Sequence, residues 1–153
     1  MEKIASFTVD HDKLEPGMYV SRTDGDVVTY DIRMKKPNAG DYLGTGEAHT
    51  LEHLFATFAR NSALKDAVVY VGPMGCRTGF YLLLRDSVPK AAALELARES
   101  MRFIAEFEGA VPGATRVECG NFADQDLAGA RRTAAAMLKV LEPLTEKDMQ
   151  YAA

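Results

Sequence analysis

The segment EAHTLEHLFATFARN, residues 47–61, is the most informative part of the chain, and its apolar residues recur at helical spacing. Apolar side chains three and four positions apart lie on one face of a helix, which then packs against a core. We therefore expect a helix over about residues 47–61. The apolar stripe that would face the core consists of Leu51, Leu54, Phe55 and Phe58.

The same segment contains the pattern HxxEH, with two of the three histidines of the chain, His49 and His53. Side chains four residues apart on a helix differ by about 40° around the axis and by one turn in height, so both imidazoles can reach one metal ion. Glu52 lies about 60° to the other side of His49. Two nitrogen ligands with a nearby carboxylate are typical of a catalytic metal site, whereas a closed structural site usually has more cysteines.

A catalytic metal site normally has a third protein ligand and one open position. The candidates are His11, Cys76 and Cys119. Cys119 precedes a glycine, and Cys76 lies in the turn sequence PMGCRTG, where the charge of Arg77 would favour a thiolate if it lies near the sulfur. One cysteine would bind the metal and the other would serve as an acid/base or nucleophile. The alternative is that each cysteine is a small core residue.

The rest of the chain reads as strands followed by helices mixed with strands. An Asp-Gly pair inside residues 23–26 predicts a hairpin turn between two β-rich runs. Ser87 should cap a helix that has Pro89 in its first turn and ends near residue 107, and a last helix should cover about residues 124–141. This order predicts an α+β fold, an antiparallel sheet packed against about three main helices. The expected strands are residues 4–9, 18–22, 27–34, 67–72, 79–85 and 114–119.

Length and charge limit the classes of function. The 153 residues predict a single domain, residues 1–153. A net charge of −4 offers neither a basic field for nucleic acid nor a polybasic patch for a membrane. No signal peptide and no apolar run of about 20 residues is visible, so we expect a cytoplasmic protein without a membrane span, in which both cysteines are free thiols or metal ligands.

Taken together, these motifs resemble the S-ribosylhomocysteine lyase (autoinducer-2 synthesis, LuxS) family over nearly the whole chain. Five segments follow one another at the family's spacing: SFTVDH at 6–11, YDIRMKKPN at 30–38, HTLEHLFATFARN at 49–61, PMGCRTGFY at 73–81 and ECGNFADQDL at 118–127. The resemblance implies that S-ribosylhomocysteine is cleaved to homocysteine and 4,5-dihydroxy-2,3-pentanedione, the precursor of a quorum-sensing signal. The route is carbonyl migration along the ribose followed by β-elimination.

The resemblance also implies roles for individual residues. His49, His53 and Cys119 match the ligands of one divalent metal per subunit, Fe²⁺ in the cell with Zn²⁺ or Co²⁺ as substitutes. Cys76 and Glu52 match the catalytic acid/base residues. The positions that match substrate-binding residues are Ser6, His11, Arg33 and Arg60. The family acts as a homodimer with two identical sites at the subunit interface.

Two positions depart from the family pattern. Tyr70 and Gly72 stand where members commonly have an aspartate and a serine, and the aspartate position lies near the amino-acid end of the substrate. Two other classes of function remain open. HxxEH is also a metallopeptidase motif, in which the glutamate activates a metal-bound water, and a degenerate homologue could bind the ligand without turning it over. Release of a thiol from S-ribosylhomocysteine would separate the lyase from both.

Overall fold

Four strands form one antiparallel sheet in the computed structural model, which describes residues 1–152. The strands are β1 (Gly17–Asp24), β2 (Val27–Arg33), β3 (Val68–Pro73) and β4 (Gly79–Arg85), in the order β1-β2-β4-β3. Gly25, with φ 59°, makes the turn between β1 and β2, as its Asp-Gly pair predicts. The turn between β3 and β4 contains Arg77 at φ 60°, and this turn presents Cys76.

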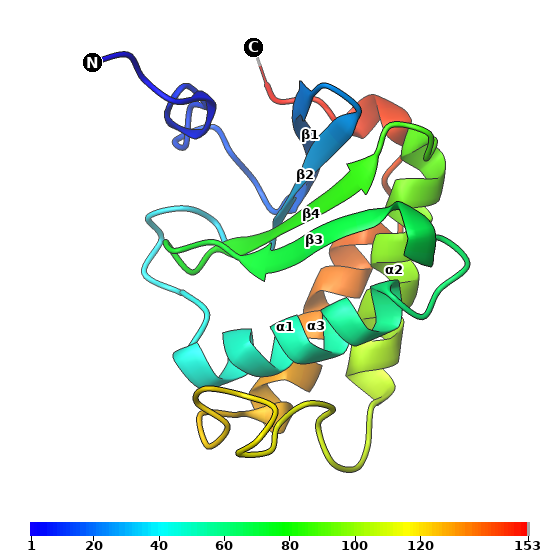
Figure 1. The fold of residues 1–153 in the computed structure, drawn as a ribbon. Helices are drawn as coiled ribbons and strands as arrows, with labels where there is room; N and C mark the ends of the chain where they lie inside the picture. Colours follow the sequence, from blue (N-terminus) through cyan, green and yellow to red (C-terminus); the bar gives the residue numbers. More distant parts are fainter. Residues whose placement is uncertain (153) are drawn as a thin grey trace.

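Three helices cover one face of this sheet (Figure 1). They are α1 (Thr45–Ala59), α2 (Lys90–Glu106) and α3 (Leu127–Leu141), and α2 packs along α3. Side chains alternate across a strand, so Ile32 of β2 and Phe80 and Leu82 of β4 point toward the helices and are fully buried. The α+β architecture, an antiparallel sheet on three main helices, is therefore confirmed.

Two expected strands are wrong. Residues 4–9 contain the short 3₁₀-helix η1 (Ala5–Phe7) and pair with no strand, and Ile4 and Phe7 are 55% and 69% exposed. Figure 1 shows this segment extending away from the sheet. Residues 114–119 form turns, in which the Cys119 amide donates to the carbonyl of Thr115. Both segments have β-forming residues but no neighbouring strand to pair with, and a strand needs a partner.

The helix ends also differ from expectation. Ser87 does not cap α2, because Pro89 is the N-cap residue, and the Ala91 amide of the first turn instead donates to the Glu146 carboxylate at 3.1 Å. Helix α3 begins three residues later than expected, where the Asp126 carboxylate accepts a hydrogen bond from the Gly129 amide. In α1, Leu51, Leu54 and Phe55 are fully buried as predicted. Phe58 is only half-buried and contacts Phe103 of α2, with ring centroids 5.0 Å apart. Two further 3₁₀-helices are η2 (Lys65–Ala67) and η3 (Glu146–Asp148).

Candidate active site

The second and third turns of α1 and the loop between α2 and α3 bring together three metal-binding side chains. His49 Nε2 lies 3.0 Å from His53 Nε2 and 3.4 Å from Cys119 Sγ. One ligand atom from each residue lies within 4.8 Å of the other two. The spacing of the two histidines on the helix produces their contact, as the sequence predicts, but Cys119 joins them from 70 residues away. This group could hold a metal ion.

The hydrogen bonds of the two imidazoles support that reading. His49 Nδ1 lies 2.8 Å from the carbonyl oxygen of Asp124, and His53 Nδ1 lies 2.7 Å from that of Pro112. A carbonyl only accepts, so each Nδ1 carries a proton, and each Nε2 presents a lone pair to the other. Two facing lone pairs at 3.0 Å repel unless a positive charge lies between them. Imidazoles fixed in this way, with a thiolate beside them, are a suitable donor set for a divalent transition metal.

Glu52 lies on the same helix and is half-buried. Among residues 1–152, its carboxylate forms no hydrogen bond or ion pair with the protein. Glu52 directly precedes His53 in the sequence, and helix geometry places it about 60° from His49 around the axis. Its oxygens are therefore available to a ligand near the His49, His53 and Cys119 side chains.

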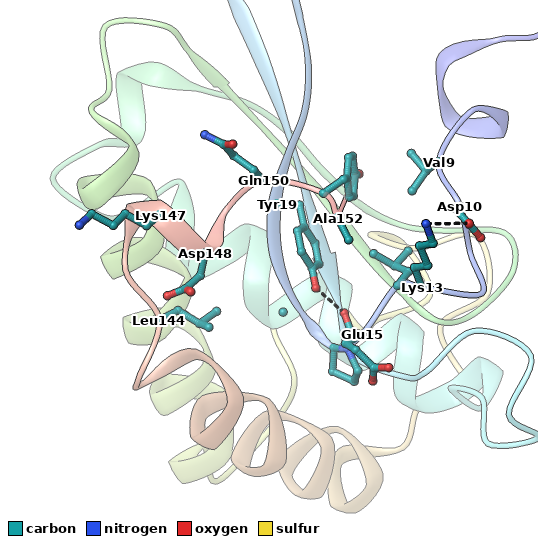
Figure 2. Close-up of a pocket in the computed structure, with 14 residues that line it drawn as sticks. Val9, Asp10, Lys13, Glu15, Tyr19, Leu144, Lys147, Asp148, Gln150 and Ala152 are labelled. Carbon is teal, nitrogen blue, oxygen red and sulfur yellow. Dashed lines mark hydrogen bonds and ion pairs between the residues drawn. The ribbon is translucent and has the colours of Figure 1, made fainter.

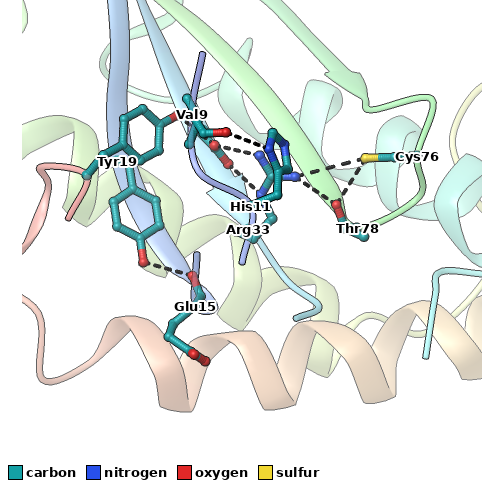
Figure 3. A network of polar contacts seen from close by, with 9 residues as sticks. Val9, His11, Glu15, Tyr19, Arg33, Cys76 and Thr78 are labelled. Carbon is teal, nitrogen blue, oxygen red and sulfur yellow. Dashed lines mark hydrogen bonds and ion pairs between the residues drawn. The ribbon is translucent and has the colours of Figure 1, made fainter. Parts of the chain in front are cut away.

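Cys76 lies in the turn between β3 and β4 and is exposed (Figure 3). Its sulfur is 3.1 Å from Thr78 Oγ1 and 4.0 Å from Nη1 of Arg33. Both cysteines are free thiols, as expected. Arg77, the cation next to Cys76 in sequence, instead points Nη1 to the carbonyl of Leu43, so Arg33 supplies the positive charge near the sulfur.

Arg33 is 3% exposed and forms a two-point ion pair with the equally buried Asp31. Nε donates to Oδ1 at 3.1 Å and Nη2 to Oδ2 at 2.7 Å, while Nη1 donates to Thr78 Oγ1 at 2.8 Å. Burial alone would lower the pKa of Arg33, but the hydrogen bonds and charge of Asp31 outweigh it, and the pKa lies above its ordinary value. The guanidinium is a permanent, fixed cation beside Cys76.

Ser6, His11, Arg33 and Cys76 line one cavity of about 250 Å³. His11 and Cys76 also line a second cavity of about 380 Å³, together with Asn38 and Arg77. The structure thus gathers three of the four expected substrate-binding residues around Cys76. Arg60 lies elsewhere, at the C-terminal end of α1, where its guanidinium donates to the carbonyls of Val68 and Val69 at the start of β3.

The two cavities that Cys76 lines include none of His49, Glu52, His53 and Cys119. A single chain therefore presents two separate groups of reactive side chains. One is the metal-binding group with Glu52, and the other is Cys76 with Arg33 and the N-terminal residues Ser6 and His11.

Comparison with known proteins identifies the family. A profile described as S-ribosylhomocysteinase (LuxS) matches residues 4–147. The chain belongs to this family. Proteins named S-ribosylhomocysteine lyase from Clostridium acetobutylicum and Clostridium beijerinckii are each 49% identical to it and align over 99% of both chains. One from Phocaeicola vulgatus is 48% identical over 99% of this chain and 98% of its own length. None of the helices within residues 1–152 has the length and apolarity that a membrane span requires.

The two departures from the LuxS family pattern prove to be one structural feature. The Tyr70 ring lies over Gly72, so that a Cβ at position 72 would overlap the Tyr70 hydroxyl and lie 2.5 Å from two ring carbons. A serine at position 72 is therefore incompatible with this position of the tyrosine ring. Tyr70 is 51% exposed and shares a cavity of about 340 Å³ with Ser6 and Tyr81.

Some residues around the site were not predicted from the sequence. The sequence pattern could have indicated Asp31, because this residue alternates with apolar residues on β2 and therefore shares a face of the strand with Arg33, two positions further on. No sequence pattern could have indicated Thr78 or Tyr151. Thr78 contacts Arg33 from 45 residues away, and Tyr151 contacts Asp31 from 120 residues away. The carbonyls of Asp124 and Pro112, which orient the histidines, are backbone groups, and no residue type in the loop predicts their contacts.

Proposed function

We propose that the protein is a carbon-sulfur lyase that cleaves S-ribosylhomocysteine to homocysteine and 4,5-dihydroxy-2,3-pentanedione. Membership of the LuxS family and the name of its full-length relatives support this reaction. The observation that carries the proposal is the presence, on one chain, of a His-His-Cys metal-binding group and a separate thiol beside a buried arginine. The atoms of the substrate equal those of the two products, so the reaction needs neither water nor a redox partner.

His49, His53 and Cys119 would hold one divalent ion, and imidazole and thiolate ligands accept Fe²⁺, Zn²⁺ and Co²⁺. Among these we propose Fe²⁺ as the metal in the cell. When bound, the ion supplies Lewis acidity toward the oxygens of the sugar.

The side chains around Cys76 suit the proton transfers that carbonyl migration requires. Arg33, His11 and Ser6 would hold the oxygens of the ribose chain in the cavity they line. Cys76 would take a proton from one sugar carbon and return it to the next, and Arg33 Nη1 and Thr78 Oγ1 face its sulfur, where they stabilise negative charge. Glu52 would move protons among the oxygens and assist β-elimination, in which the carbon–sulfur bond breaks and homocysteine leaves as a thiol.

A second copy of the chain would complete the site. We propose a homodimer with two identical sites, because Cys76 and the metal-binding group do not share a cavity within one chain. Exposed apolar side chains that a partner could cover include Ile4 and Phe7 of the N-terminal segment and Tyr70 of strand β3. Arg60 would act at the amino-acid end of the substrate, next to the strand that carries Tyr70. Two free thiols fit the cytoplasm, the location we propose.

The two cysteines provide a matched pair of variants, since Cys76 and Cys119 are the only cysteines in the chain. The metal-loaded protein is incubated with S-ribosylhomocysteine, and free thiol and bound metal are both measured. Cys76→Ala should abolish thiol release with metal content near that of wild type, whereas Cys119→Ala should lose the metal as well. Full activity of Cys76→Ala would refute its role. Binding of substrate by the wild type without thiol release would identify a degenerate homologue, and cleavage of peptides would identify a metallopeptidase.

A further inference from the structure

Tyr151, in the segment after η3, makes the last contact in a chain of polar groups that reaches Cys76. Its hydroxyl donates to Asp31 Oδ2 at 2.7 Å. Burial and the negative charge of Asp31 raise the pKa of Tyr151, so the hydroxyl stays protonated and remains a donor. None of the proposed catalytic steps uses this hydroxyl, although only Asp31 separates it from Arg33 in the network.

Asp31 is the link between Tyr151 and Arg33. Its carboxylate accepts three hydrogen bonds, two from Arg33 and one from Tyr151, and it is only 1% exposed. Little of its surface is open to solvent, so its position is set mainly by these three donors. Because the bond from Tyr151 falls on the same oxygen as the shorter bond from Arg33, the tyrosine helps to fix the rotation of the carboxylate and so the plane of the guanidinium.

The ring of Tyr151 is itself held in place. It stacks on Tyr19 of β1, with centroids 5.1 Å apart and planes 22° apart, and the Tyr19 hydroxyl donates to the carbonyl of Glu15. Tyr151 lines the cavity that contains Arg33 and Cys76 and also a cavity of about 430 Å³ on its other side. Figure 2 shows this second cavity between the segment of Asp10 and Lys13 and that of Lys147 and Asp148. The ring is thus part of the wall between the two cavities.

We propose that Tyr151 is a positioning residue, which fixes Asp31 so that Arg33 presents its Nη1 group to the substrate cavity beside Cys76. The inference rests on the proposed function, because the binding of substrate by Arg33 is part of that function. Tyr151 itself contacts neither Cys76 nor the metal-binding group in any hydrogen bond of residues 1–152.

The test uses Tyr151→Phe, which keeps the ring and the stack and removes only the donor. Loss of one hydrogen bond to a charged group, transmitted in part to the substrate, should lower kcat/KM for thiol release by about 3- to 10-fold. Tyr19→Phe is the matched control, since it removes the hydroxyl of the other stacked ring, which bonds to Glu15 and not to Asp31. It should change kcat/KM by less than about 2-fold, because it keeps the stacked ring and its hydroxyl forms no hydrogen bond with Asp31 or Arg33.

A double-mutant cycle separates positioning from a general effect on folding. In an Arg33→Lys background, which lacks the planar guanidinium, Tyr151→Phe should have less than about a 2-fold effect. The proposal would be overturned if Tyr151→Phe lowered kcat/KM by the same factor in both backgrounds, or did not lower it in the wild-type background. It would also be overturned if Tyr19→Phe lowered kcat/KM as much as Tyr151→Phe does.

A second measurement does not depend on activity or on the folding of Arg33→Lys. The NMR signal of the Arg33 Nε–H group reports its bond to Asp31 directly. In Tyr151→Phe this proton should shift and exchange faster with water than in wild type and Tyr19→Phe, and an unchanged signal would overturn the proposal. If the wild type releases no thiol, the lyase assignment fails, and this measurement still decides whether Tyr151 positions Arg33.

Discussion

Gly79→Ala should destabilise the protein strongly, because a Cβ at this residue would meet the backbone of the neighbouring central strand. Gly79 pairs with Arg33 between β4 and β2. A Cβ at this position would overlap the carbonyl oxygen of Ile32 and lie 3.1 Å from the Arg33 Cα. These are backbone atoms of a hydrogen-bonded strand, so neither can move without breaking the ladder that carries Arg33.

Overpacking a well-packed site costs about 1–3 kcal/mol, and a clash with backbone belongs at the upper end of that range. For a chain of this length, 1 kcal/mol lowers Tm by roughly 2–4 °C, so we expect a loss of about 6–12 °C. The assay is urea unfolding and calorimetry at one fixed metal concentration, since bound metal raises the apparent stability. Activity should fall as well, because Gly79 follows Thr78 and faces Arg33.

Gly72→Ala provides the matched comparison. Its new Cβ would also meet atoms at short range, but those atoms are the far end of Tyr70, which is 51% exposed and can swing into solvent. The substitution should therefore cost less than about 1 kcal/mol. If Gly79→Ala were as stable as wild type, or if Gly72→Ala were destabilised to the same extent, the reasoning from backbone contact would be wrong.

Three further predictions concern the site. His53→Ala removes one of three ligands, so metal content measured by mass spectrometry should fall well below one ion per chain, and retention of the ion would contradict the assignment. Lys36 donates to the carbonyls of Asp12 and Leu14 and to the Glu15 carboxylate at 2.9–3.1 Å. Lys36→Met should release the N-terminal segment, which should raise KM and speed proteolytic cleavage before residue 16. An unchanged KM and an unchanged cleavage rate would show that other contacts hold the segment. Tyr70→Asp restores the residue common in the family and should lower KM with little change in kcat, and a higher KM would show that this chain binds its substrate differently.

The sequence contained enough local information to predict both hairpins and the helices α1, α2 and α3 to within a few residues. Helical spacing and turn residues such as Gly25 are local signals. Residues 4–9 and 114–119 show the limit of such signals, because strand formation depends on a partner that composition does not reveal. The histidine pair followed from spacing, while the placement of Cys119 and Cys76 came from the family resemblance. Contacts such as that of Tyr151 with Asp31 exist only in the folded chain.

The contacts between α1 and the loop that joins α2 to α3, residues 107–126, include Cys119 beside His49 and the carbonyls of Pro112 and Asp124 at the two histidines. An ion at this group would lose Cys119 as a ligand when these contacts separate, so local opening of the loop should speed its release. Extraction by a chelator would then reach a plateau as chelator concentration increases. The loop would therefore help to set how long an ion stays bound, because it carries one of the three ligands and orients the other two.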